Sequence, residues 1–249
     1  MSMLHTVVGR SPWTLAFVAL ALVSCVENRS SVTITHNAVM ASDCVVSGTD
    51  TAFRSMGTLD VGAAAMSCYL PEYVMFPMVE NNLLSTEATG AIETNYVEIV
   101  EARINLDLGA MGDSFEDLRF KYPAFKTLAP GEAAPLEVVV IPHQYAQLFA
   151  SYVQSTGEQP IIRVKLKFMY QHGGYEHETH EIEYPIKLCA GCLIFETNIA
   201  CNSGLVDPGW PKGNQCLLTN AQDEQVYCCT DPASACPVCP AVDTSTTTE

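Results

Sequence analysis

The cysteines are the feature that most restricts how this chain can fold. The sequence holds eleven of them; eight lie within the last 61 residues, and none occurs between residues 69 and 188. The C-terminal segment has few large apolar side chains, so it cannot bury much of a core. Each disulfide that closes a loop there can contribute about 2–4 kcal/mol. We therefore expect this segment to be held together by cross-links.

A short apolar run near the N-terminus indicates export. It covers the eleven residues from Trp13 to Val23 and follows Arg10, the only basic residue in this region. The run is shorter than the ~20 residues that an apolar helix needs to cross a bilayer, so it is typical of a signal peptide. Ala19-Leu20-Ala21 would suit an ordinary secretory cleavage site.

The residues that end this run, Leu22-Val23-Ser24-Cys25, resemble the lipobox of bacterial lipoproteins. The resemblance implies that the Cys25 thiol receives a diacylglyceryl group and that the chain is cut before it, making residues 1–24 a signal peptide. Val26 is not the Asp that retains lipoproteins in the inner membrane, which implies the outer membrane without deciding which face. Two or more acyl chains give stable anchoring, so the expected partner is a membrane, reached through the N-terminal lipid anchor.

Without Cys25, ten cysteines remain, and an even number in an exported protein predicts five disulfides. These ten are Cys44, Cys68, Cys189, Cys192, Cys201, Cys216, Cys228, Cys229, Cys236 and Cys239. The simplest partition joins Cys44 to Cys68 and closes four bridges within the C-terminal cluster. The sequence does not give the connectivity.

Two CxxC motifs, at Cys189/Cys192 and Cys236/Cys239, allow other chemistry. Four thiolates can form a tetrahedral zinc site, and a single CxxC can act as a redox pair. Four more cysteines lie between the motifs, and the surroundings predict strand and loop rather than the βαβ context of a thioredoxin-like motif. We therefore favour structural disulfides, with no metal and no cofactor.

The charge balance is strongly acidic, with a formal net charge of −16. Cleavage before Cys25 would leave 11 basic and 28 acidic residues. Such a surface repels nucleic acid, which we exclude as a partner. The alternative to a solubilising role is the binding of cations or basic ligands.

The middle of the chain predicts strands. The apolar positions of Asn95 to Leu108 change phase, which indicates a bulge near Glu101. Around Gly173-Gly174, alternating apolar and charged residues predict a hairpin that pairs Arg163 with Glu183. After Pro142, apolar residues at helical spacing predict one helix, which should end near Gly157.

Several short strands, one helix and frequent turns predict a mainly β fold, an immunoglobulin-like antiparallel β-sandwich followed by a small disulfide-rich module. We expect a lipidated tether at 25–42, the sandwich at 43–188, the disulfide-rich module at 189–240 and a disordered tail at 241–249.

No residue pattern predicts catalysis. The sequence lacks G-x-S-x-G, Walker, GxGxxG and EF-hand motifs. His172, His177 and His180 gather near the hairpin, but strand alternation puts His177 and His180 on opposite faces, so a solvated hairpin tip is the simpler interpretation.

The overall layout, with a lipobox, a sandwich and a cysteine cluster that opens at Tyr184 to Cys192, resembles uncharacterised Cys-rich lipoproteins of predatory soil bacteria. This resemblance implies no activity. We therefore expect an exported, lipid-anchored protein of the cell envelope that is not an enzyme. Its role would be binding or structural, with an envelope or surface protein as a partner. The alternative is a secreted thiol/disulfide redox or zinc-binding protein that uses the two CxxC motifs.

Overall fold

The computed structural model describes residues 31–41, 43–49, 51–65, 69–86, 92–115, 118–200, 216–217 and 220–230. Cys25, the signal peptide and the C-terminal tail lie outside these ranges. None of the helices in the described ranges has the length and apolar character needed to cross a bilayer.

The described elements are mostly strands, together with one α-helix and two short 3₁₀ helices. In chain order they are β1 (Val32–Asn37), β2 (Gly57–Asp60), η1 (Val61–Ala65), β3 (Tyr73–Met75), β4 (Pro77–Asn81), β5 (Val97–Asp107), η3 (Gly109–Ser114), β6 (Leu118–Leu128), β7 (Ala133–Pro135), β8 (Val138–Ile141), α2 (His143–Thr156), β9 (Ile161–His172), β10 (Tyr175–Glu178), β11 (Ile182–Cys189), β12 (Ile194–Ala200) and β13 (Val226–Thr230).

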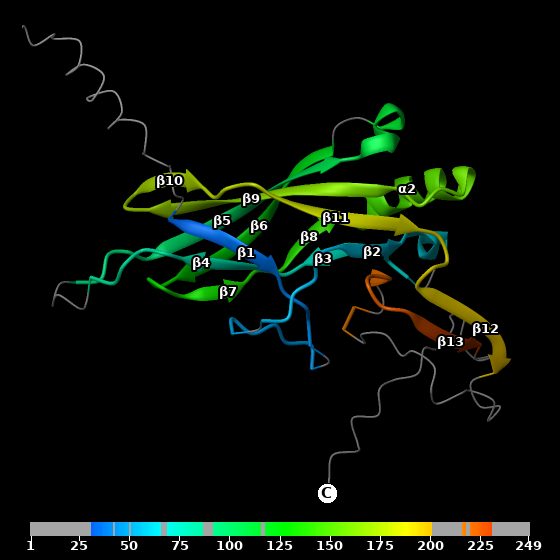
Figure 1. Cartoon of the computed structure of the whole chain (residues 1–249), viewed down its shortest axis with the longest axis horizontal. Coiled ribbons are helices and arrows are strands. Elements are labelled where there is room, and N and C mark those ends of the chain that lie inside the picture. Colours follow the sequence, from blue (N-terminus) through cyan, green and yellow to red (C-terminus); the bar gives the residue numbers. More distant parts are fainter. Residues whose placement is uncertain are drawn as a thin grey trace, which may run out of the picture. The chain divides into compact units, whose positions relative to one another are not determined.

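The fold is mainly β, with its sheets stacked as a sandwich around a shared core (Figure 1). The large sheet has the strand order β2-β11-β9-β5-β6, with β10 added to β9, and it faces the β1-β4-β7 and β3-β8 sheets. Side chains from both layers, such as Val79 of β4, Val138 of β8 and Leu166 of β9, share one buried core. Two pairings depart from the antiparallel pattern, because β2 runs parallel to β11 and β12 runs parallel to β13.

The predicted phase change in β5 is confirmed. The register of β5 shifts between Ile99 and Glu101 against both neighbouring strands. Because of this bulge, Ile99 and Ala102 are both fully buried although they are three residues apart. The extra residue keeps apolar side chains on the core side along the whole of an eleven-residue strand.

The hairpin of β9 is present, but its predicted register is wrong by two residues. Gly173 and Gly174 both have positive φ, 60° and 82°, so the turn has two residues rather than three. The register shifts again after β10, and Glu183 pairs with Lys165 instead of Arg163. An even shift leaves every side chain on its predicted face.

The predicted helix is confirmed as α2, which begins at His143 with Pro142 as its N-cap. It ends at Thr156, and Gly157 adopts the left-handed conformation with its N–H bonded to the carbonyl of Val153. Phe149 and Val153 enter the shared core from this helix.

The predicted start of the sandwich needs correction. β1 begins at Val32, inside the range assigned to the tether, because it pairs with β4 and buries Val32.

Candidate functional site

The disulfide pattern differs from the simplest partition. Cys44 is bonded to Cys216, with 5.4 Å between their Cα atoms, and not to Cys68. The expected pairing was wrong because it assumed that the N-terminal cysteines bond locally, whereas Leu217, the residue after Cys216, packs against the cluster of Ala38, Val74, Phe76 and Met78 near Cys44.

Cys189 and Cys192 of the first CxxC form a second disulfide. Cys228 is also disulfide-bonded. The remaining predicted half-cystines are Cys68, Cys201, Cys236 and Cys239, which lie outside the described residues, and Cys229, which lies in β13 with its side chain undescribed.

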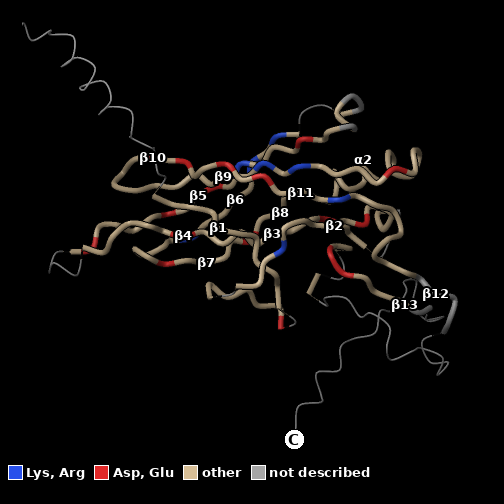
Figure 2. The backbone as a smooth tube through the Cα atoms, in the orientation of Figure 1, with Lys and Arg blue, Asp and Glu red and all other residues tan. Residues whose placement is uncertain are grey.

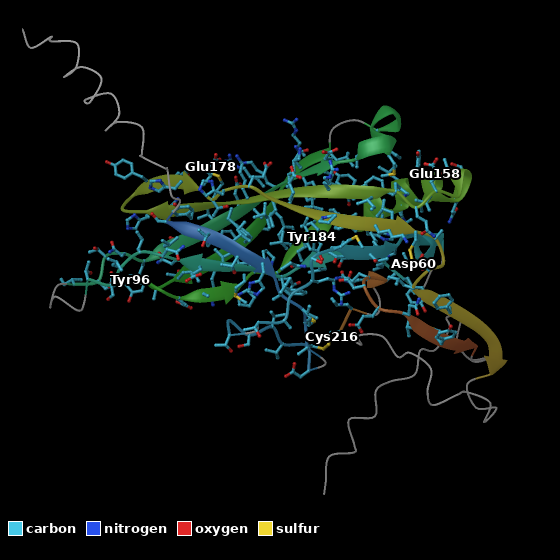
Figure 3. The ribbon with its side chains drawn as sticks, in the orientation of Figure 1. Asp60, Tyr96, Glu158, Glu178, Tyr184 and Cys216 are labelled. Atoms are coloured by element: carbon cyan, nitrogen blue, oxygen red, sulfur yellow. A yellow bond between two sulfur atoms is a disulfide. The ribbon has the colours of Figure 1, made fainter. Side chains whose placement is uncertain are left out.

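A buried carboxylate holds the CxxC loop in place (Figure 3). Asp60, at the end of β2, is 1% exposed and accepts four backbone N–H groups. Its Oδ1 accepts from Gly62 at 3.1 Å and Gly191 at 2.8 Å. Its Oδ2 accepts from Leu193 at 2.9 Å and Ile194 at 3.2 Å. The carboxylate therefore fixes the turn between β11 and β12 by compensating donors that would otherwise be buried unpaired.

The same residues are the one group within the described ranges whose ligand atoms are close enough to share a metal ion. The carboxylate of Asp60 and the sulfurs of Cys189 and Cys192 lie within 4.8 Å of one another. They do not fit zinc, because the sulfurs are bonded to each other and the carboxylate oxygens already accept four N–H groups. Cys189 is fully buried and Cys192 half-buried, so Cys192 is the more accessible residue of the disulfide.

A second carboxylate, that of Asp223, whose side chain is 10% exposed, ties the C-terminal segment to the sandwich. The Tyr73 hydroxyl donates to both oxygens of Asp223 at 2.9 Å, and the Thr58 N–H donates to Oδ1 at 2.9 Å. Tyr184 lies 3.2 Å from the same tyrosine hydroxyl, and Arg54 approaches Asp223 at 3.5 Å. Burial raises the pKa of Asp223, although the cation and these donors favour its charged form.

The neighbouring Gln222 supports the same connection. Its side chain accepts the N–H of Val74 at 2.8 Å and donates to the carbonyl of Val74 at 3.0 Å, like a paired strand. The cavity beside it has a volume of only about 20 Å³, enough for about one water molecule. We therefore interpret this cluster as a structural connection rather than a ligand site.

The histidines of the hairpin do not converge. The rings of His172 and His177 lie 6.5 Å apart, and His177 stacks on Tyr170 at 5.3 Å. His180 belongs to neither contact and is exposed. This agrees with a solvated hairpin tip.

The outer face of the large sheet has a shallow groove of about 550 Å³. Its charged lining is Arg103, Arg119, Lys121, Lys165, Lys167 and Glu181. Five cations around one groove are unexpected in a protein whose net charge is −16. We call these five residues together with Arg163 the cationic face.

Sequence reasoning missed Asp60, Asp223 and the cationic face. Asp60 and Asp223 belong to no motif, and their partners lie far away in the chain. The sequence predicts that Arg163, Lys165 and Lys167 share the solvent-exposed side of one hairpin, but it does not connect them to cations on other strands. The cations of β5 and β6 could have been added to them by placing β5 next to β9 and β6 on the other side of β5.

Comparisons with known proteins do not assign a family. No family model and no curated protein matches this chain. Among solved structures, a protein from Archaeoglobus fulgidus is similar with a TM-score of 0.32 and 10% identity, over 47% of this chain and 86% of that one. The ASH/PapD-like domain 7 of human CEP192 is similar with a TM-score of 0.28 and 9% identity, over 76% of this chain and 96% of that one. Similarity at this level says nothing about function.

Proposed function

We propose that this protein is an exported bacterial lipoprotein, anchored in the outer membrane through Cys25, with a non-catalytic binding or structural role at the cell envelope. The observation that carries the proposal is the disulfide between Cys44 and Cys216, which are 172 residues apart. Such long-range bridges persist in oxidising compartments and are rare in the cytosol. Their presence in a chain that begins with a lipobox-like signal favours maturation outside the cytosol.

The position of the first strand supports the same proposal. β1 begins at Val32, seven residues after Cys25. A fully extended chain of that length spans at most about 25 Å. An acylated Cys25 would therefore hold the folded domain close to the membrane surface, where its binding partners would have to be.

Metabolic labelling with a palmitate analogue tests the anchor. We expect the wild-type protein to carry the label and to sediment with membranes washed in high salt, which removes electrostatic binding, and Cys25→Ala to lose both properties. Cys44→Ala is the matched control, since it removes a cysteine outside the lipobox and should keep the label. A Cys25→Ala protein that is still labelled, or a wild-type protein without label, would contradict the proposal.

A thiol/disulfide redox function is the second candidate. It is favoured by the half-buried Cys192, which forms a disulfide three residues from its partner beside the Asp60 carboxylate. Titration of the native protein with a thiol reagent separates the two functions. Zero free thiols before and after mild reduction support a structural disulfide. Two thiols that appear on mild reduction and disappear with oxidised glutathione would support redox activity.

A further inference from the structure

The basic residues of this chain are concentrated on one sheet (Figure 2). Eight of the twelve lie in four strands of the large sheet, namely Arg103 in β5, Arg119, Lys121 and Lys126 in β6, Arg163, Lys165 and Lys167 in β9, and Lys187 in β11. The rest of the molecule is correspondingly more acidic. A charge asymmetry of this size orients a protein in an electric field and attracts one face to anions.

Strand register places these cations next to one another. Arg103 pairs with Lys121 on one side and with Lys167 on the other. In the next row Asn105 pairs with both Arg119 and Lys165. Like charges directly opposite each other on adjacent strands are destabilising, so this arrangement needs nearby anions to offset the repulsion.

Acidic neighbours neutralise the face only in part. Glu101 contacts Arg103 at 2.8 Å and Lys121 at 3.0 Å, yet its side chain is 23% exposed while that of Lys121 is 64% exposed. Asp107 lies 3.9 Å from Arg163, with side-chain exposures of 35% and 63%. Lys121 and Arg163 are therefore more exposed than the carboxylates that they contact, whereas Lys165, 3.5 Å from Asp107, is slightly less exposed than its partner. Towards β10 and β11 the carboxylates are more exposed than the lysines that they contact. Glu178 and Glu183 therefore mark the edge of the cationic face.

An exposed aromatic residue lies on the same side of β6. Phe125 is 75% exposed, and strand alternation places it on the face of Arg119 and Lys121. Cations combined with a protruding aromatic ring suit the boundary between lipid headgroups and acyl chains.

We propose that the cationic face docks onto the anionic phospholipid surface of the membrane. The proposal rests on the lipid anchor proposed above, which keeps the domain within about 25 Å of that surface. The cations contact headgroup phosphates, Phe125 enters the headgroup layer, and the acidic remainder of the domain points away from the membrane. Docking of this kind fixes the orientation of the domain, which an acyl chain alone leaves free.

Vesicle sedimentation of the unacylated chain, residues 25–249 with Cys25→Ser, tests the docking separately from the anchor. The probes are vesicles of phosphatidylcholine with 30 mol% phosphatidylglycerol, in place of the native lipids, and vesicles of phosphatidylcholine alone. We expect binding to the anionic vesicles only, and loss of that binding when salt is raised from 0.1 to 0.5 M.

Three variants locate the contact. Lys121→Gln with Arg163→Gln should lower the partition coefficient by about fivefold per removed cation. Glu183→Gln should raise it, because it removes a negative charge beside Lys165. Lys126→Gln is the matched control, since Lys126 lies on the opposite side of β6, and binding should not change. Far-UV circular dichroism checks that each variant is folded.

Four results would overturn the proposal. They are equal binding to both vesicle types, no binding to either, an effect of Lys126→Gln as large as that of the double variant, and binding of soluble pyrophosphate at these residues without vesicle association. A wild-type protein that lacks the palmitate label, together with intact vesicle binding, would contradict the lipid anchor but not the docking surface. A labelled protein whose unacylated form does not bind vesicles would contradict the docking surface but not the anchor.

Discussion

At the scale of single residues, Tyr73 lies where the two sheets and the C-terminal segment meet. Its hydroxyl contacts Asp223 and Tyr184, and its ring lies against Gly57 of β2. A Cβ atom at Gly57 would overlap both the hydroxyl and the ring. Gly57 is therefore required because a larger residue would have no room beside Tyr73, and not because of its backbone conformation.

We expect Gly57→Ala to lower the free energy of unfolding by about 1–3 kcal/mol, because the buried tyrosine has no room to move. Gly112→Ala is the control, since a Cβ there would meet nothing within 4 Å. Urea denaturation of both variants measures the difference. Equal stabilities would show that Tyr73 does not occupy the space beside Gly57.

Asp223 gives the stability a defined pH dependence. Burial raises its pKa above the ordinary value of 3.8, so the folded protein binds this proton more tightly than the unfolded chain does. Its contribution is then most favourable below pH 3.8 and declines as the pH rises through the folded pKa.

Asp223→Asn removes that titration. We expect the stability of the wild type, relative to this variant, to fall as the pH rises from 3.5 to 7. Chemical denaturation across this range measures it. A relative stability that rises with pH would mean that the pKa is lowered, with Arg54 outweighing burial.

At the scale of elements, the turn from β11 to β12 depends on Asp60. Asp60→Ala leaves four backbone N–H groups without their acceptor, three of them in that turn. We expect the free energy of unfolding to fall by more than about 3 kcal/mol, since hydrogen bonds to a charged group are strong and unpaired buried donors are costly. Asp107→Ala is the comparison, because the half-buried Asp107 at the end of β5 accepts one backbone N–H, that of Gly109, and its loss should cost less.

The same variant should make the Cys189–Cys192 disulfide easier to reduce, because the loop that shields Cys189 loosens. Alkylation after graded dithiothreitol treatment, read by mass spectrometry, reports this directly. Unchanged reduction together with unchanged stability would show that Asp60 does not hold the loop.

Several local features of the strands and the helix were predicted correctly from the sequence, because each depends on residues that are close together in the chain. The bulge near Glu101, the buried alternation of β9 and the glycine that ends α2 can all be recognised within a dozen residues. The hairpin register was missed because two one-residue shifts, at Gly173-Gly174 and after β10, add up to an error that alternation cannot detect.

The candidate sites were missed for the opposite reason. Asp60 contacts residues more than 130 positions away, and Asp223 contacts Thr58 across 165 positions. Such contacts follow from the three-dimensional fold and leave no local spacing. The cationic face likewise becomes visible only once β5, β6 and β9 are known to be neighbours.

At the scale of the whole molecule, the Cys44–Cys216 disulfide connects the beginning of the domain to its C-terminal segment. Closing a loop of 172 residues contributes up to about 5 kcal/mol in the chain-entropy model. Closing the three-residue separation of Cys189 and Cys192 contributes only about 2 kcal/mol in the same model.

We therefore expect Cys44→Ala with Cys216→Ala to destabilise the protein more than Cys189→Ala with Cys192→Ala. Guanidinium unfolding of the two double variants compares them. A larger loss from the CxxC pair would mean that the segment around Cys216 is held mainly by Gln222 and Asp223 and not by its disulfide.

The central claim is that this chain is an exported lipoprotein whose remaining cysteines are oxidised. Intact mass spectrometry of the protein extracted from its native membrane tests it most directly. The expected species starts at Cys25, carries the added mass of an acylated glyceryl group and lacks ten hydrogens, two for each of five disulfides. A species that starts at any other residue with Cys25 unmodified, or that retains residues 1–24 and free thiols, would contradict the claim.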